Sequence, residues 1–208
     1  MRAISIICLL VLTASLCLAL PQQNIVTVRP ADIVDLAEID PSVRVDMMYA
    51  SAGNFIGAPV DGYNANICYL TLNAALGLKN AQRRLQETAR GKNLTLVVHD
   101  CYRPYKAVSQ FVKWAGDPKD TKMKSVFYPD LDKQQLIEQN YISPVSGHSR
   151  ASSIDLTIAE IGADGEVKPL PMGTPLDFFG VRSHTAFPDI PEEQKQNRRL
   201  LGAVMELE

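Results

Sequence analysis

The sequence predicts a single α+β domain with a mostly antiparallel sheet flanked by helices. Apolar residues recur at helical spacing over residues 72–89, and an unbroken apolar segment at 94–98 follows as a buried strand. A second strand is expected at residues 153–161, ahead of an Asp164-Gly165 turn. Because helical and strand segments do not alternate strictly, we expect antiparallel pairing rather than a doubly wound parallel sheet.

Each predicted helix has its own boundary signal. The first ends where Gly91 can cap it, and the next begins at Pro104, whose missing N–H costs nothing in a first turn. Another helix is expected over residues 131–141, and the acidic start at 191–193 suits the positive end of a last helix. The apolar face of the first helix comprises Leu72, Ala75, Leu78, Ala81, Leu85 and Ala89.

Residues 1–20 have the pattern of a secretory signal peptide. A short positively charged start precedes an apolar run over residues 3–18, and small residues follow it. The domain then comprises residues 21–208. We expect an exported product, periplasmic or extracellular, without a stable membrane anchor, because no later stretch is long and apolar enough to cross a bilayer.

The charge argues against one class of partner, and the cysteine content indicates a candidate disulfide. The formal net charge is −2, and no dense Lys/Arg cluster is present, so a nucleic-acid partner is not expected. Two of the four cysteines, Cys8 and Cys17, fall in the signal segment. The other two, Cys68 and Cys101, are candidates for a disulfide in an oxidising compartment; the alternative is two buried, unpaired thiols.

One segment places an imidazole and a carboxylate at the start of a predicted strand. His148 and Asp155 lie seven positions apart in Ser146-Gly147-His148-Ser149-Arg150-Ala151-Ser152-Ser153-Ile154-Asp155. Zinc in a hydrolytic site usually takes three protein ligands from His, Asp or Glu and keeps one position for water. The pair is therefore a candidate for two zinc ligands. On spacing alone, the alternative is ordinary hydrogen-bonded surface groups.

A second polar segment, His99-Asp100-Cys101-Tyr102-Arg103-Pro104, joins a predicted strand to a predicted helix. Loops held by such rigid elements often carry functional side chains. Arg103 is suited to bind a carboxylate bidentately or to stabilise an oxyanion. The alternative is that Asp100 caps the helix and that Arg103 lies on the surface.

Together the two segments resemble the zinc D-alanyl-D-alanine dipeptidases. Ser146-x-His148-x6-Asp155 and Asp100-x-Tyr102-Arg103-Pro104 carry this resemblance. The family is related to the D,D-carboxypeptidases and shares a small α+β zinc fold with the hedgehog signalling domain. Further similar segments follow in order along nearly all of the mature chain: residues 45–49, 54–57, 62–63, 172–177, 182–184 and 197–201.

The resemblance implies roles for particular residues. His148 and Asp155 would bind one Zn2+ per chain, and Arg103 would stabilise the transition state. Tyr102 and Ser146 would bind substrate. The implied reaction is hydrolysis of D-Ala-D-Ala to two D-alanines by a zinc-activated water, without a covalent intermediate. D-Ala-D-Ala or other peptidoglycan-derived peptides are thus the expected partners.

Two departures from the family pattern bear on activity. The family has Gly where this chain has Ala151, and Ala where it has Ser153; the first matters if the backbone needs a positive φ. The family also ends in a Glu-Trp-Trp-His segment, whose Glu is the general base and whose His is the third zinc ligand. Neither has a counterpart up to Glu208, where the last helical pattern stops.

Three hypotheses follow from these departures. In the first, the protein is a working exported dipeptidase, and the 208 residues are a C-terminally incomplete copy. In the second, the chain is a catalytically impaired short product that binds D-Ala-D-Ala or muropeptide ends. In the third, it is a D,D-carboxypeptidase or endopeptidase acting on longer peptidoglycan stems. His184 is a candidate substitute for the third ligand, although its Arg-Ser-His motif precedes the last helix.

Overall fold

The computed structural model describes residues 30–88 and 93–206. The predicted signal peptide and the predicted helix cap at Gly91 lie outside the described residues. Among the helices of the described ranges, none combines the length and the apolarity needed to cross a membrane.

The larger sheet has four strands in the order β2-β4-β5-β6. It comprises β2 (Arg44–Val45), β4 (Leu94–Asp100), β5 (Asp155–Ile161) and β6 (Val167–Pro169). The last three strands pair antiparallel, whereas β2 pairs with β4 in parallel. The predicted α+β class with a mostly antiparallel sheet is therefore confirmed. The two-residue strand β2 was not predicted, because it is too short to show a pattern.

A smaller antiparallel sheet pairs β1 (Ile33–Asp35) with β3 (Tyr69–Thr71). Each strand has only three residues, so neither shows an alternation that sequence could reveal. This sheet lies directly before the helix that begins at Leu72, and it brings β3 to the end of β4, where the backbone N–H of Tyr102 donates to the carbonyl of Tyr69 at 3.1 Å.

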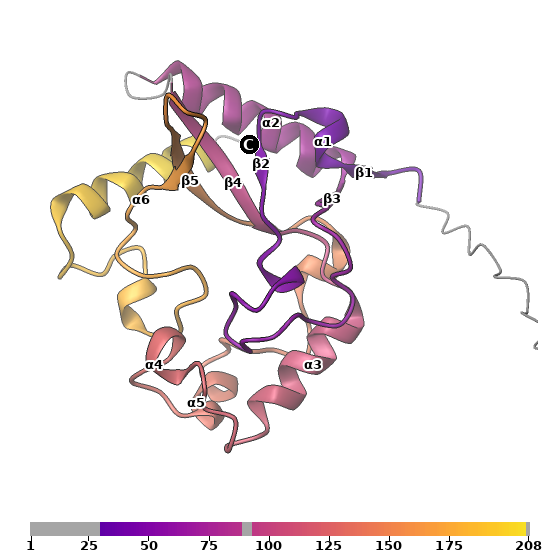
Figure 1. Cartoon of the computed structure of the whole chain (residues 1–208), viewed down its shortest axis with the longest axis vertical. Coiled ribbons are helices and arrows are strands. Elements are labelled where there is room, and N and C mark those ends of the chain that lie inside the picture. Colours follow the sequence, from indigo (N-terminus) through magenta and orange to yellow (C-terminus); the bar gives the residue numbers. More distant parts are fainter. Residues whose placement is uncertain (1–29, 89–92, 207–208) are drawn as a thin grey trace, which may run out of the picture.

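Helices lie at both ends of the molecule: α1 and α2 at one, and α3, α4 and α5 at the other (Figure 1). The α-helices are α1 (Leu36–Ile39), α2 (Leu72–Glu87), α3 (Tyr105–Ala115), α4 (Lys124–Phe127), α5 (Lys133–Glu138) and α6 (Glu192–Met205). Three short 3-10 helices are η1 (Met48–Ala50), η3 (Gly147–Arg150) and η4 (Val181–Ser183). The predicted helices at 104 and 191 each begin one residue later than expected, because Pro104 and Pro191 are the N-cap residues. The one predicted at 131–141 is shorter.

Helix α2 is fixed to β4 by a buried amide. The helix begins after Thr71, whose hydroxyl accepts the backbone N–H of Ala74. Gln82, 1% exposed, accepts the backbone N–H of Leu96 at 2.8 Å and donates to Thr95 Oγ1 at 3.2 Å. Gln82 therefore satisfies a backbone donor of β4 that would otherwise be buried unpaired. Leu72, expected on the buried face, is instead 40% exposed.

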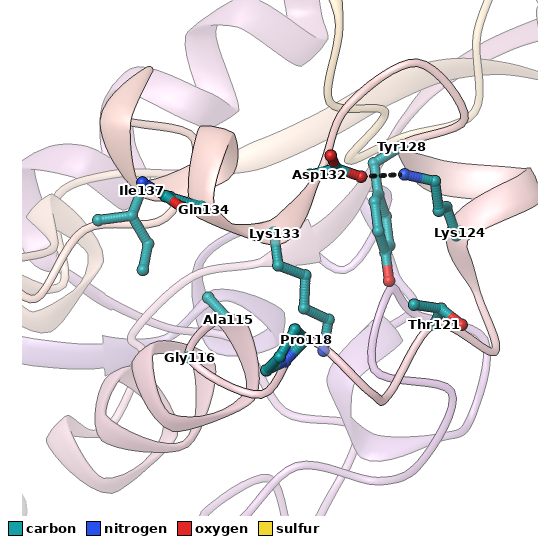
Figure 2. Close-up of a pocket in the computed structure, with 10 residues that line it drawn as sticks. All are labelled: Ala115, Gly116, Pro118, Thr121, Lys124, Tyr128, Asp132, Lys133, Gln134 and Ile137. Carbon is teal, nitrogen blue, oxygen red and sulfur yellow. Dashed lines mark hydrogen bonds and ion pairs between the residues drawn. The ribbon is translucent and has the colours of Figure 1, made fainter.

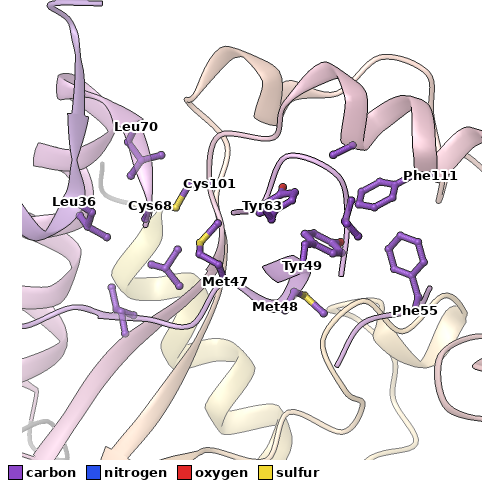
Figure 3. Close-up of a cluster of buried hydrophobic side chains, with 14 of the residues drawn as sticks. Leu36, Met47, Met48, Tyr49, Phe55, Tyr63, Cys68, Leu70, Cys101 and Phe111 are labelled. Atoms are coloured by element: carbon purple, nitrogen blue, oxygen red, sulfur yellow. A yellow bond between two sulfur atoms is a disulfide. The ribbon is translucent and has the colours of Figure 1, made fainter. Parts of the chain in front are cut away.

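The core has two halves: an aliphatic half that includes Leu36 and Leu70, and an aromatic cluster (Figure 3). Phe55, 2% exposed, contacts the rings of Tyr49, Phe111, Trp114 and Phe179 with centroid separations of 5.9, 4.9, 4.9 and 5.1 Å. These partners come from η1, from α3 and from the segment before η4. Phe55 thus joins parts of the chain that are distant in sequence.

A disulfide joins Cys68 and Cys101, with the two Cα atoms 5.5 Å apart. Both residues are fully buried. Figure 3 shows them between Leu36 and Leu70 on one side and the aromatic rings on the other. The bridge therefore connects the two halves of the core at the point where β4 ends.

Removing the Phe55 ring is expected to destabilise the fold strongly. Phe55→Ala should lower the free energy of unfolding by about 3–5 kcal/mol, because it opens a cavity between four other aromatic rings. Urea unfolding followed by circular dichroism measures this change. The matched control is Leu76→Ala on the exposed side of α2, where the side chain is 43% exposed; this change should stay within about 0.5 kcal/mol. Equal effects of the two substitutions would contradict the assigned core.

Candidate metal centre

Three side chains converge where β4 ends and β5 begins. Asp100 is the last residue of β4, His148 belongs to η3, and Asp155 is the first residue of β5. The antiparallel register sets Asp100 opposite Asp155. One oxygen or nitrogen atom from each of the three residues lies within 4.8 Å of the other two. The two predicted ligands are thus brought together, and a buried carboxylate joins them.

The His148 ring is oriented by the loop after β4. Its Nδ1–H donates to the carbonyl oxygen of Cys101 at 2.9 Å, and its Nε2 lies 3.5 Å from Asp155 Oδ1. Because Nδ1 carries the proton, Nε2 of the neutral ring has the lone pair that could bind a metal ion. Burial favours that neutral ring, but hydrogen bonding and charge from Asp155 outweigh burial and raise the pKa of His148.

Asp100 is fully buried, and both of its oxygens already have partners. Oδ1 accepts from the Tyr63 hydroxyl at 2.6 Å and from the Cys101 backbone N–H at 2.9 Å. Oδ2 accepts from Arg103 Nε at 2.8 Å and Nη2 at 2.6 Å. Burial raises the pKa of Asp100, whereas Arg103 acts in the opposite direction. Asp100 therefore does not cap the helix as the alternative proposed, and it is better suited to orient its neighbours than to bind a metal.

Arg103 is held beside the donor pair rather than on the surface. Its side chain is only 14% exposed. Besides its two bonds to Asp100, Nη2 lies 3.4 Å from Asp155 Oδ2. The guanidinium carbon lies 5.3 Å from the Tyr49 ring centroid and 5.1 Å from that of Phe111. Carboxylates and ring faces together restrict the guanidinium to one position.

The backbone around His148 is tied to the Arg103 loop. Ser146 accepts the His148 backbone N–H at 3.3 Å, and the Arg103 N–H donates to the His148 carbonyl at 3.2 Å. Ser149 Oγ donates to the Arg103 carbonyl at 3.0 Å. A Cβ at Gly147 would lie 2.5 Å from Ser153 Oγ, so a larger residue there would require the Ser153 side chain to move.

Ala151, which stands where the family has Gly, adopts the left-handed conformation, with φ 55°. Its N–H donates to the His148 carbonyl at 2.9 Å, and its carbonyl accepts from the Thr71 N–H at 2.8 Å. A non-glycine residue in this region costs about 1–2 kcal/mol. Both backbone groups are paired, which offsets part of that cost and keeps the turn between η3 and β5 in place.

The remaining predicted site residues are not members of this cluster. Ser146 is half-buried at the start of η3, and Tyr102 is 41% exposed. His184 is exposed, and its Nε2 lies 3.3 Å from the Tyr141 hydroxyl. Over the described parts of the chain, His184 is not in the group formed by Asp100, His148 and Asp155. The geometry therefore gives no support to His184 as a substitute ligand.

Two residues near the cluster were not recognised from sequence. The Tyr49 hydroxyl donates to Asp177 Oδ2 across 128 positions. Burial, followed by the charge of Asp155, raises the pKa of Asp177 to about 6. Asp177 also has a positive φ of 55°. The only sequence signal was its place in the segment 172–177, which resembled the family without indicating a role.

The loop that carries Asp177 is attached to α6 by Arg198 and by Asn197, whose Nδ2 donates to the Pro171 carbonyl at 3.0 Å. Arg198 donates from Nε to the Met172 carbonyl at 2.7 Å, from Nη1 to the His184 carbonyl at 2.6 Å and from Nη2 to the Arg182 carbonyl at 2.8 Å. These three bonds hold both ends of the loop. Helix α6 thereby contributes to the position of Asp177, although it contributes no group to the cluster itself.

A cavity of about 510 Å³ lies elsewhere, between the end of α3, α4 and α5 (Figure 2). None of the three clustered residues lines it. Two lysines on its wall have structural partners: Lys124 pairs with Asp132 at 2.9 Å, and Lys133 donates to the Trp114 carbonyl at 2.7 Å at the end of α3. Lys133 thus satisfies a carbonyl at a helix C-terminus.

The sequence that forms this site is similar to that of known proteins. The peptidase M15 family, described as D-Ala-D-Ala dipeptidase, matches residues 29–207. The chain belongs to this family. A D-alanyl-D-alanine dipeptidase of Enterococcus faecium is 40% identical over 171 residues, which are 82% of this chain and 81% of that protein.

Two further relatives of the same name come from different bacteria. The protein of Streptomyces coelicolor is 36% identical over 176 residues, or 84% of this chain and 83% of the relative. That of Escherichia coli K12 is 31% identical over 174 residues, or 84% of this chain and 76% of the relative. The resemblance drawn from the sequence motifs is therefore confirmed at the level of the family.

The raised pKa of Asp177 predicts a dependence of stability on pH. In the unfolded chain this carboxyl titrates near 4, so between about pH 4 and pH 6 the folded chain binds more protons. Stability from this group is therefore present below pH 4 and falls as pH rises to 6. In metal-free protein, the stability of Asp177→Asn relative to the original chain should rise by about 2 kcal/mol between pH 4 and pH 7.

Urea unfolding at the two pH values, with a chelator present, measures this gain. Groups that act on Asp177, namely Asp155, Tyr49, Arg103 and Asp100, are unchanged in the comparison. The control is Asp189→Asn, which makes the same chemical change at an exposed loop position. A pH-independent difference for Asp177→Asn would show that this carboxyl is not perturbed in the fold.

Proposed function

We propose that this protein is an exported zinc metallopeptidase that hydrolyses D-Ala-D-Ala to two D-alanines. The observation that carries the proposal is that the Asp155 carboxylate lies 3.4 Å from the Arg103 guanidinium and 3.5 Å from His148 Nε2. Membership of the D-Ala-D-Ala dipeptidase family, and the names of the bacterial relatives, support the substrate.

The donor chemistry fits zinc. An imidazole nitrogen and a carboxylate oxygen are ligands that Zn2+ prefers, and the Nδ1 bond to the Cys101 carbonyl is the kind of outer contact that orients a zinc-bound histidine. His148 and Asp155 would hold the ion. Zinc, when bound, supplies a Lewis acid that polarises a carbonyl and lowers the pKa of a water molecule. Asp100 would remain an orienting group, because its oxygens are already used.

Arg103 is suited to stabilise the charge that develops on the scissile carbonyl oxygen. Its guanidinium is fixed before substrate arrives, by Asp100 on one edge and by two ring faces. A preorganised cation needs no rearrangement during reaction, which is why such groups lower the barrier most effectively. The second Nη2 contact, to Asp155, supports this role, because an ion held by Asp155 would be near the guanidinium.

The substrate carries a free ammonium and a free carboxylate. We assign the ammonium to Asp177, whose carboxylate is held by the Tyr49 hydroxyl and is ionised above its pKa of about 6. Ser146 and Tyr102, at the start of η3 and at the exposed edge of the Arg103 loop, keep their proposed role in binding substrate. Because a longer stem peptide has no free ammonium at this position, binding of the ammonium by Asp177 would favour a dipeptide substrate.

The signal-like segment at residues 1–20 supports export to the periplasm or the extracellular space. There the protein would meet D-Ala-D-Ala and other peptidoglycan-derived peptides. Turnover of cell-wall fragments suits this location, whereas depletion of a cytoplasmic precursor does not. We propose no nucleic-acid partner, in line with the near-neutral charge.

Binding without turnover is the second candidate function. Hydrolysis needs a base that takes a proton from water, and the metal-ligating group found over the described residues contains two aspartates and no glutamate. A protein with this cluster alone would bind D-Ala-D-Ala or muropeptide ends and release no D-alanine.

The test of function uses purified protein with added Zn2+ and three substrates. D-Ala-D-Ala should release D-alanine, whereas the N-acetylated dipeptide, which lacks the ammonium, should react far more slowly. Preferred cleavage of a longer stem peptide ending in D-Ala-D-Ala would instead support a D,D-carboxypeptidase. Calorimetric binding of D-Ala-D-Ala with no release of D-alanine would support the second candidate.

Loss of the Arg103 side chain is expected to reduce catalysis and leave the metal in place. Arg103→Ala should lower kcat for D-Ala-D-Ala by about 10²–10³-fold, because it removes the cation that faces the developing oxyanion. Zinc content, measured by atomic emission, should change little. The control is Arg83→Ala on the exposed face of α2. Full activity of Arg103→Ala would refute the assigned role.

Loss of the His148 ring is expected to abolish metal binding. His148→Ala removes one of two donor groups, and each lost ligand removes a large share of the affinity. Metal analysis after dialysis should therefore find almost no zinc in this variant. His184→Ala is the matched control, because its ring lies outside the cluster, and it should retain zinc. Zinc retained in His148→Ala and lost in His184→Ala would show that His184, and not His148, binds the metal.

A further inference from the structure

We propose that the Cys68–Cys101 disulfide is a positioning element of the metal centre, in addition to stabilising the core. By holding the Cys101 backbone, it fixes the carbonyl that orients His148, and zinc affinity then depends on the bridge. This inference rests on the proposed zinc site, although one of its tests needs no zinc.

Cys101 contacts two site groups through its backbone. Its N–H donates to Asp100 Oδ1, and its carbonyl accepts the Nδ1–H of His148, both at 2.9 Å. The sulfur of the same residue is bonded to Cys68. Any movement of Cys101 would therefore move the acceptor that keeps the His148 proton on Nδ1 and leaves Nε2 free.

The other half of the bridge lies on a well-anchored segment. Cys68 precedes β3, and its carbonyl accepts the Leu36 N–H at 2.9 Å. Within β3, the Tyr69 carbonyl accepts the Tyr102 N–H at 3.1 Å, and the Thr71 N–H donates to the Ala151 carbonyl at 2.8 Å. Strand β3 thus supports both the Arg103 loop and the turn that follows His148.

The loop after β4 needs such support, because the sheet no longer holds it. The register between β4 and β5 shifts between Val98 and Asp100, and pairing ends at Asp100. Beyond that point, backbone bonds at Tyr102 and Arg103 continue the attachment, and the disulfide is the covalent link to β3. Both sulfurs are fully buried, so the bridge acts inside a packed core.

Groups that orient a metal-bound histidine typically change metal affinity by 10–100-fold when they are lost. A disulfide that only stabilised the core would lower the unfolding temperature and leave the affinity of the folded protein unchanged. The two roles are therefore separable by measuring zinc affinity under conditions in which each variant is folded.

The first experiment measures the Kd for Zn2+ by chelator competition in Cys68→Ala/Cys101→Ala and in the original chain. We expect Kd to rise about 10-fold in the folded variant. The matched control is Leu85→Ala, which opens a cavity at a fully buried position of α2, a different element from the Cys101 loop and from the rings that hold Arg103; its Kd should not change. An unchanged Kd in the double variant, or an equal rise in Leu85→Ala, would overturn the proposal.

The second experiment reads the His148 ring in zinc-free protein by nitrogen NMR at alkaline pH. In the oxidised chain the proton should reside on Nδ1, whereas loss of the bridge should give a mixture of Nδ1–H and Nε2–H forms. A pure Nδ1–H ring in both states would refute the positioning role.

If the double variant does not fold, the original chain is reduced instead. A phosphine supplies two electrons to break the S–S bond, and one water molecule supplies the two protons of the new thiols and the oxygen of the phosphine oxide. The same NMR comparison then applies. Failure of the original chain to bind zinc or to cleave D-Ala-D-Ala would refute the proposed function, and the ring measurement would still decide the role of the bridge.

Discussion

The buried carboxylate of Asp100 is the group on which the site depends. Its oxygens accept from Tyr63, from the Cys101 backbone and twice from Arg103, so one side chain fixes a cation, a loop and a phenol together. It has no exposed surface. Removing Arg103, the cation among these partners, would leave the buried charge without a counter-ion, at a cost of about 3–5 kcal/mol. The arrangement is therefore stable as a whole and sensitive at each contact.

Strand pairing brings this carboxylate to the proposed ligands. Antiparallel β4 and β5 set Asp100 opposite Asp155, and η3 then places His148 above them. The turn after η3 tolerates Ala151 at a positive φ because its N–H and carbonyl are both bonded. Rigid strands with a short, fully bonded turn hold reacting groups more closely than a free loop would.

Much of the fold was predictable because long elements leave a periodic pattern. The seven-residue strands β4 and β5 and the helices α2, α3 and α6 all appeared in the sequence; the starts of α2 and β4 agreed, and the other three differed by one or two residues. The strands β1, β2 and β3 did not appear, since two or three residues cannot display a period. Their existence depends on partners that are distant in sequence.

The sequence by itself determined the family and the chemical types at the site: an imidazole and a carboxylate seven positions apart, and an arginine after a strand. Only the tertiary structure decided what Asp100 does, that Asp177 lies beside Tyr49, and that His184 is outside the cluster. Contacts across 128 positions leave no local pattern, because they arise from how strands pair and loops return. Spacing can therefore propose ligands, whereas folding determines which lone pairs remain free.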